Sequence, residues 1–229
     1  MDILFFAAVA LFIFFKLNKQ LGKIDEEEKK NILDKIAKRR EEILAAQAQM
    51  AQQNQQPRVV SPLAITDANP ADEKILSALD SNTKQNFLSI LQSCNISAEF
   101  FINGVKSSFE MILKAFSTAD MEILKFLLSD KIYKGFEAAV NQRKSQESTL
   151  ITNVIAVENA EIIAASLAGN MATVTVKIAS KQINYISDKN SQIIEGRKDE
   201  ISDLTDIWTF QKDITSPNPN WVVSATSNA

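Results

Sequence analysis

Histidine is absent from this 229-residue chain, and its absence excludes several classes of enzyme at once. Without it there is no Ser-His or Cys-His nucleophile pair, no imidazole base and little scope for a zinc site. Cysteine occurs once, as Cys94, so neither an intrachain disulfide nor a CxxC pair can form, as expected of a reducing compartment. We interpret Cys94 as a small buried hydrophobic residue.

Glycine is also scarce, with five residues in the whole chain. None of them is spaced as a phosphate-binding loop or a dinucleotide fingerprint requires. No recognisable catalytic motif remains, so the sequence predicts a protein that is not an enzyme and that holds no cofactor and no metal.

Charge is nearly balanced, but it is spread unevenly. The formal net charge is −3, and residues 71–229 carry fifteen basic against nineteen acidic side chains, a difference of −4. An acidic domain without a basic stripe is poorly suited to a phosphate-rich partner. We therefore expect no nucleic acid among the partners.

The N-terminus begins with an uninterrupted apolar run. Residues 3–15 (ILFFAAVALFIFF) are all apolar, and Lys16, Lys19 and Lys23 follow. As a helix the run spans roughly 20 Å of a hydrocarbon core about 30 Å thick, and its flanking residues extend it. A signal peptide has positive charge before the run, whereas Asp2 stands there. We predict a transmembrane anchor over residues 1–17, with the following domain on the cytoplasmic side because the three lysines come after the span.

Two connecting segments follow the anchor. Residues 18–56 mix charges of both signs and predict a charged helical stalk that fades into a Gln-rich stretch of low complexity. Residues 57–70 contain three prolines and read as a linker. A folded domain is then expected over residues 71–229.

The first half of this domain has helical periodicity. Short helices are expected over residues 72–79, 83–94 and 121–128, and a further one begins at Asp130 after a capping Ser129. The strongest pattern repeats Phe101, Val105, Phe109, Ile112 and Phe116 on one face, after Ser97 as N-cap. Helices therefore precede the strands.

The second half alternates as strands do. Residues 150–157 and 162–167 form either one strand or two, Gly169-Asn170 marks a turn, and strands follow over 172–185, 201–213 and 221–225. The apolar phase slips between Ile178 and Ile183, which predicts a β-bulge there. A polar loop is expected over residues 187–198. Helices followed by bent antiparallel strands indicate an α+β fold.

Four segments carry a resemblance to a known family. They are FINGVKSSFEMILKAF (101–116), LLSDKIYKGFEAAV (127–140), DIWTF (206–210) and PNPNWVVSAT (217–226). In this order they resemble the C-terminal domain of the Tim44-like family, whose mitochondrial members tether the import motor to the presequence translocase. The short bacterial members resemble this chain in joining a membrane helix, a charged stalk and this domain.

The resemblance implies a fold and a set of partners. The fold is similar to the nuclear-transport-factor-two-like cone, in which helices pack on a curved four-stranded antiparallel sheet around an apolar pocket. The implied partners are the lipid bilayer, inner-membrane or translocase proteins and a DnaK-type chaperone. The long N-terminal half of the mitochondrial relatives has no counterpart here, and the motor-tethering role depends on it.

Three functions are open at this point. The first is a scaffold that assists protein transport or membrane-protein assembly at the cytoplasmic face of a bacterial inner membrane. Its pocket would take a peptide segment or an acyl chain; the same aromatic residues could instead simply fill the core. The expected lining consists of Phe109, Tyr133, Phe136, Trp208 and Phe210.

The second is an enzyme of the same cone fold that uses Asp206. This carboxylate shares strand parity with Trp208, so it could point inward and act as a base with a raised pKa. It could equally be a capping or Trp-bonded residue at the rim. The third is a component of an envelope secretion machine, similar to the inner-membrane core subunit of type IV systems, whose domain lies in the periplasm.

Overall fold

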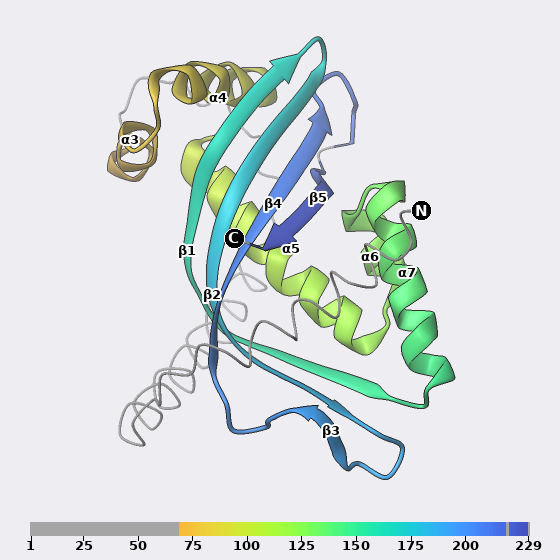
Figure 1. The fold of residues 1–229 in the computed structure, drawn as a ribbon. Coiled ribbons are helices and arrows are strands. Elements are labelled where there is room, and N and C mark those ends of the chain that lie inside the picture. Colours follow the sequence, from red (N-terminus) through yellow and green to blue (C-terminus); the bar gives the residue numbers. More distant parts are fainter. Residues whose placement is uncertain (1–68, 219, 229) are drawn as a thin grey trace, which may run out of the picture. The chain divides into compact units, whose positions relative to one another are not determined.

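The computed structural model describes residues 69–218 and 220–228. Within these residues five helices come first and five strands follow (Figure 1). The helices are α3 (Pro70–Ser77), α4 (Ser81–Cys94), α5 (Ala98–Thr118), α6 (Met121–Leu127) and α7 (Asp130–Ser145). The strands are β1 (Thr149–Ala168), β2 (Met171–Ser187), β3 (Ile193–Gly196), β4 (Ser202–Asp213) and β5 (Val222–Asn228). The predicted anchor, the stalk, the linker up to residue 68, and Lys16, Lys19 and Lys23 lie outside the described residues.

Side chains with short polar groups start most of the helices. The Asp80 carboxylate accepts hydrogen bonds from the backbone N–H groups of residues 82 and 83 at the start of α4. Ser97 accepts from Phe100 N–H at the start of α5, as predicted, and Asp120 does the same for α6. These caps satisfy N–H groups that have no partner within their own helix.

The start of α7 differs from the prediction. Ser129 does occupy the N-cap position, but its hydroxyl makes no capping hydrogen bond and is buried without a partner among the described residues. Its backbone N–H instead donates to Val223 O of β5 at 2.9 Å. Leu128 also forms a bridge with Val223. Ser129 is therefore held in place by the backbone contacts between the α6–α7 corner and β5. A side-chain capping hydrogen bond does not hold it.

The sheet is antiparallel and has five strands, where four were predicted. The order is β1-β2-β4-β5, and the short β3 lies off this path and pairs with β2. β3 lies within the expected polar loop, where Ile193 and Ile194 are exposed. This strand was not predicted, because four residues are too few to show a periodic pattern.

The bulges lie on a different strand from the predicted one. β2 pairs with β4 in unbroken register from Met171 to Gln182. β1 is a single strand of 20 residues, and its pairing with β2 shifts register three times, between residues 154 and 156, 157 and 159, and 162 and 164. Such irregularities bend a strand and sharpen its twist. The β2–β3 and β4–β5 pairings each have one further register shift, so the predicted bulge within residues 178–183 of β2 is not found in its pairing with β4.

One face of the sheet, here called the inward face, packs against α5 (Figure 1). Every second residue of β2 from Ala172 to Ile178 is completely buried on this face, opposite Trp208 and Phe210 of β4. α5 covers it with Phe101, Phe109 and Ile112, and α4 adds Phe87 and Ile90 to the same core. This apolar layer joins the helices to the sheet.

Candidate functional site

Three of the five residues predicted to line a pocket lie together in the core. Phe109 of α5 has 0% of its surface exposed, and Trp208 and Phe210 of β4 have 4% and 2%. The ring centroids of Phe109 and Trp208 are 4.8 Å apart, and those of Trp208 and Phe210 are 6.5 Å apart. These three side chains pack closely against one another. A ligand bound in the predicted pocket would therefore contact them only at the bottom of the pocket.

The other two predicted residues lie on α7 and are partly buried. Phe136 packs against Phe116 near the end of α5, with ring centroids 4.8 Å apart. The Tyr133 hydroxyl donates a hydrogen bond to the Glu137 carboxylate at 3.1 Å. Burial is the main cause that raises the pKa of Tyr133, and the hydrogen bond and negative charge of Glu137 raise it further. Tyr133 and Phe136 therefore retain accessible surface that the three core aromatics lack.

Arg143 joins this α7 group to the end of α5, and the sequence analysis missed it. Its Nη2 donates to Phe116 O at 2.6 Å, and its guanidinium carbon lies 4.3 Å from the centroid of the Phe116 ring. Nη1 is buried without a hydrogen-bond partner among the described residues, and burial lowers the pKa of Arg143. A cation at the carbonyl end of a helix interacts favourably with the helix dipole. We interpret Arg143 as a structural link between the two helices.

A strip of polar side chains continues the inward face below the apolar layer. Ser180 and Gln182 of β2 have only 2% and 3% of their surface exposed. Gln182 Nε2 donates to Ser180 Oγ at 2.8 Å, and Asn184 Nδ2 donates to Gln182 Oε1 at 3.1 Å. In the sequence, Ser180 and Gln182 appear to shift the apolar residues from one face of the strand to the other. In the structure the inward alternation of β2 continues without interruption, and these two inward positions are occupied by buried polar residues.

Asp206 belongs to the same face, as its strand parity predicted. It pairs with Ile178 of β2 on one side and with Asn228 of β5 on the other. Among the described residues its carboxylate has no hydrogen bond and no ion pair. Burial alone raises its pKa from 3.8 to about 6. We call Ser180, Gln182, Asn184 and Asp206 the polar strip.

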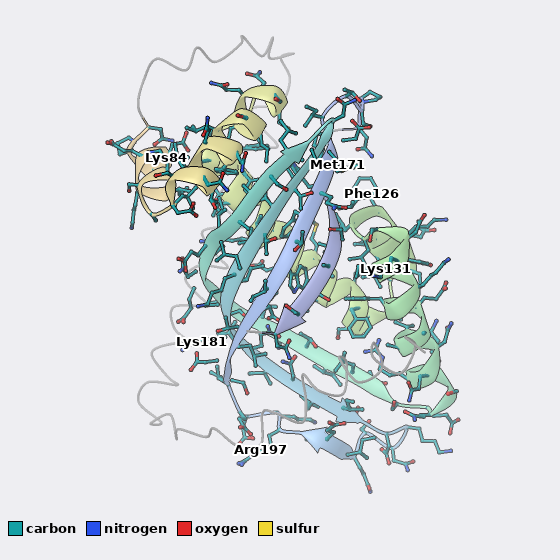
Figure 2. All side chains as sticks on the ribbon, turned by 45° about the horizontal axis from the view of Figure 1, so that its top comes forward. Lys84, Phe126, Lys131, Met171, Lys181 and Arg197 are labelled. Carbon is teal, nitrogen blue, oxygen red and sulfur yellow. The ribbon has the colours of Figure 1, made fainter. Side chains whose placement is uncertain are left out.

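The outward side of the sheet has different chemistry. Lys181 forms ion pairs there with Asp203 at 2.6 Å and with Glu158 at 3.5 Å. Figure 2 shows Lys181 on the side of the strands away from Phe126 and Lys131. Lys181 and its two partners are thus paired on the outward side, whereas Asp206 has no ion pair on the inward side within the described part of the chain.

Neither metal binding nor thiol chemistry has a built site in the described residues. No group of three or more side chains of the metal-binding types comes together there. Cys94 is free and partly buried at the end of α4, and burial is the main cause that raises the pKa of its thiol.

The comparison with protein families decides the identity of this domain. A model of the Tim44-like domain matches residues 93–228, from the end of α4 to the end of β5. The chain belongs to the Tim44-like domain family. The match covers more than half of the sequence and includes all four segments in which the resemblance was seen.

Two other comparisons add little to the Tim44-like assignment. A search of curated proteins finds no significant match. Among solved structures, the intermembrane space region of the chloroplast protein ARC6 is similar at 14% identity and a TM-score of 0.40, covering 58% of this chain and 96% of that one.

The helices of the folded part of this Tim44-like protein are not membrane spans by length and composition. No helix within residues 69–228 has both the length and the apolar composition needed to cross a membrane. The predicted anchor lies before these residues.

Proposed function

We propose that this protein is a membrane-attached binding and scaffolding module that assists protein transport or membrane-protein assembly. The observation that carries the proposal is the match of residues 93–228 to the Tim44-like domain, which accounts for most of the folded part. Family members act in protein transport as binding and scaffold domains rather than as enzymes. The thirteen apolar residues at positions 3–15 support attachment to a bacterial inner membrane, and Lys16, Lys19 and Lys23 support a cytoplasmic domain.

The binding surface proposed here is the apolar pocket of the cone-type fold. Phe109, Trp208 and Phe210 would form its floor, because they are buried against one another. Tyr133 and Phe136 would contact the occupant, because they are the members of the set that remain partly exposed. An apolar peptide segment or an acyl chain fits aromatic walls of this kind.

Crosslinking in native membranes tests the scaffold function. A photoreactive residue at position 136 should capture a defined set of inner-membrane or translocase proteins, or a DnaK-type chaperone. The matched control is position 175, whose Thr175 hydroxyl is bonded to Thr209 in the middle of the sheet, away from α7. The proposal fails if both positions capture the same proteins, because specific binding at α7 would then be absent.

Topology separates this proposal from an envelope secretion component. A phosphatase that is active only in the periplasm, fused after residue 229, should stay inactive. Full phosphatase activity would place the domain in the periplasm and would favour the secretion machine instead.

Asp206 supports a second candidate, an enzyme of the same fold. An inward carboxylate with a pKa of about 6 could act as a base near neutral pH. If so, Asp206→Asn abolishes function in cells while the folded protein still captures its partners. If the protein is a scaffold, partner capture and cellular function change together.

A further inference from the structure

The outer edge of β5, which is the side turned away from β4, changes along its length. At its start Val223 is buried, and its backbone oxygen accepts a hydrogen bond from Ser129 N–H at 2.9 Å. Leu128 forms a parallel bridge with the same residue. Further along, Ala225, Ser227 and Asn228 are exposed and Thr226 is partly buried. The α6–α7 corner therefore covers the edge at Val223 and leaves residues 225–228 accessible.

The backbone of residues 225–228 has hydrogen-bonding partners on one side only. These residues pair with β4 between Asp206 and Thr209. Beyond β4, none of their backbone groups makes a hydrogen bond within the described part of the chain. In an antiparallel pair of strands, alternate residues turn their N–H and C=O groups away from the partner strand. Every second residue of this stretch therefore presents a free donor and a free acceptor at the edge.

β5 also lacks the features that usually prevent an edge strand from pairing further, which are charged side chains, proline and bulges. Its sequence, VVSATSN, has no charge and no proline, and its one register shift lies before residue 225. β1, at the opposite edge, has Glu158, Glu161 and three register shifts. β3 is followed directly by the charged residues 197–200. Among the edges of the described sheet, the end of β5 is thus the one without such protection.

The groups at this edge determine the chemistry of what can bind them. Donors and acceptors that alternate along a strand are matched by another extended backbone, as in β-strand addition. An acyl chain has neither kind of group. The bridge between Leu128 and Val223 shows that the protein's own chain pairs at this edge, and the pairing stops because α7 begins at Asp130. An extended polypeptide could continue the sheet beyond that point.

The position of the edge also indicates which side chains such a strand would carry. Thr226 pairs with Trp208 and shares its inward face, and the Trp208 ring lies 4.8 Å from that of Phe109 on α5. A strand added to β5 would lie about 4.8 Å further out, on the side where α7 runs (Figure 1). Every second side chain would point toward the helices, where Tyr133 and Phe136 are partly exposed. Apolar residues at alternate positions suit this arrangement.

We propose that the outer edge of residues 225–228 binds an extended segment of a partner polypeptide as a further strand of the sheet. Backbone hydrogen bonds hold the segment, and its alternate apolar side chains face the helices. This inference rests on the proposed scaffold function and specifies how the polypeptide partner is held. Because the edge carries no charge, recognition depends on the backbone and on the alternation of side chains rather than on ion pairs.

Hydrogen exchange of the full-length chain in phosphatidylcholine nanodiscs tests the site. The probe is an acetylated and amidated peptide of alternating valine and threonine with a lysine at each end. Its control is the same peptide with N-methyl groups on alternate backbone nitrogens, which removes donors along one edge. We expect saturable binding of the probe, with slower exchange in residues 225–228 and no change in residues 158–164 of β1. The methylated peptide should bind more weakly by about tenfold or more, because at least two hydrogen bonds are lost.

Variants at exposed positions test the same edge from the side of the protein. Ala225→Lys combined with Ser227→Lys places two charges on β5 and should abolish the slower exchange, with the fold verified by thermal melting. Ile163→Lys is the matched control, because Ile163 is exposed on the opposite edge strand, and it should leave binding intact.

Three results would overturn the proposal. The first is equal binding of the methylated peptide, and the second is slower exchange along β1 in place of β5, or on addition of laurate in place of the peptide. The third is slower exchange of residues 225–228 in the chain alone as its concentration rises, with a dimer detected by light scattering. That result would assign the edge to a second copy of the chain.

The outcome for this edge is separable from that for the scaffold function. A photoreactive residue at position 227 should capture the same partners in native membranes as one at position 136. If the probe fails to bind and position 227 captures nothing while position 136 still captures defined partners, strand addition is refuted and the scaffold function stands. Loss of specific capture at both positions with intact probe binding would refute the scaffold function instead.

Discussion

The two halves of the inward sheet face use the same geometry for different purposes. In the upper half, Val174, Val176 and Ile178 lie opposite Trp208 and Phe210 and exclude water completely. In the lower half, Ser180 and Gln182 continue the same alternation and are buried just as deeply, but they are polar. Burial on this face therefore follows the alternation of β2, whereas composition decides whether a buried position is filled by apolar packing or by hydrogen-bonded polar groups.

The difference matters because the two kinds of residue respond to different perturbations. Burial of apolar area contributes stability that is nearly independent of pH. A buried carboxylate contributes a term that changes with pH, because its proton is held differently in the folded and unfolded states. pH and mutation can consequently separate the two halves in one protein.

The largest effect is expected in the apolar half. Phe109→Ala removes a fully buried ring that packs on Trp208, and the free energy of unfolding should fall by about 3–5 kcal/mol. Thermal or urea unfolding measures it, and the loss should be the same at pH 5 and pH 8. Phe136→Ala is the control, with a smaller loss because Phe136 is partly exposed. Equal losses for the two variants would show that Phe136 on α7 contributes to the apolar layer as much as Phe109 does.

The second effect has the opposite sign and depends on pH. In the unfolded chain Asp206 titrates near 3.8, and in the folded protein near 6. Below the lower value both states hold the proton, so Asp206→Asn should change little. As pH rises to 6 the unfolded state releases its proton first, and wild-type stability falls. Above pH 7 the variant should be more stable by about 2–3 kcal/mol.

Unfolding of both proteins from pH 4 to pH 8 measures this effect, and the quantity to compare is the difference between them. Other carboxylates titrate in both proteins and cancel in that difference. A difference that does not vary with pH would mean that Asp206 is well solvated in the folded state, and the contrast between the two halves would then disappear.

The sequence predicted much of the upper half and little of the lower half. Phe101, Phe109 and Phe116 repeat at helical spacing, and Ser97 marks where that helix begins, so α5 was predicted with its buried face. Residues 172–178 alternate without interruption, and the turn at Gly169-Asn170 was predicted where β1 and β2 meet. These signals are local, and regular apolar periodicity produces them.

The lower half was misinterpreted because polarity hid its burial. Ser180 and Gln182 interrupt the apolar pattern, so a β-bulge was predicted in β2, although β2 pairs with β4 in unbroken register there and the shifts in the β1–β2 pairing come from extra residues of β1. Their hydrogen bond is local, between residues two apart on one strand, but their burial depends on elements that are distant in the sequence, and no local pattern indicates it. The role of Arg143 was missed for the same reason, because Phe116 O is 27 residues away.

A third prediction tests whether the polar strip is one network. Gln182→Leu leaves the Ser180 hydroxyl and the Asn184 amide without their partner, and an unsatisfied buried group costs about 1–3 kcal/mol. We expect a loss of about 2 kcal/mol in the free energy of unfolding. The double variant Ser180→Ala with Gln182→Leu should recover part of it, because fewer polar groups then lack partners. Strict additivity of the two changes in urea unfolding would argue against a connected network.

The smallest effect is expected at the lower end of the strip, where β3 meets β2. Gly196 has a φ of +73°, which is in the left-handed region, and a Cβ atom there would lie 2.4 Å from Asn184 O. Gly196→Ala should therefore detach β3 from Asn184 and Tyr185, with a cost of about 1 kcal/mol that is confined to this short strand. Hydrogen exchange should become faster in residues 193–196 and in their pairing partners on β2, and remain unchanged in residues 172–178. Gly104→Ala is the matched control, because nothing lies within 4 Å of a Cβ atom at that position. Faster exchange that spreads to residues 172–178 would show that the two halves of the face unfold as one unit.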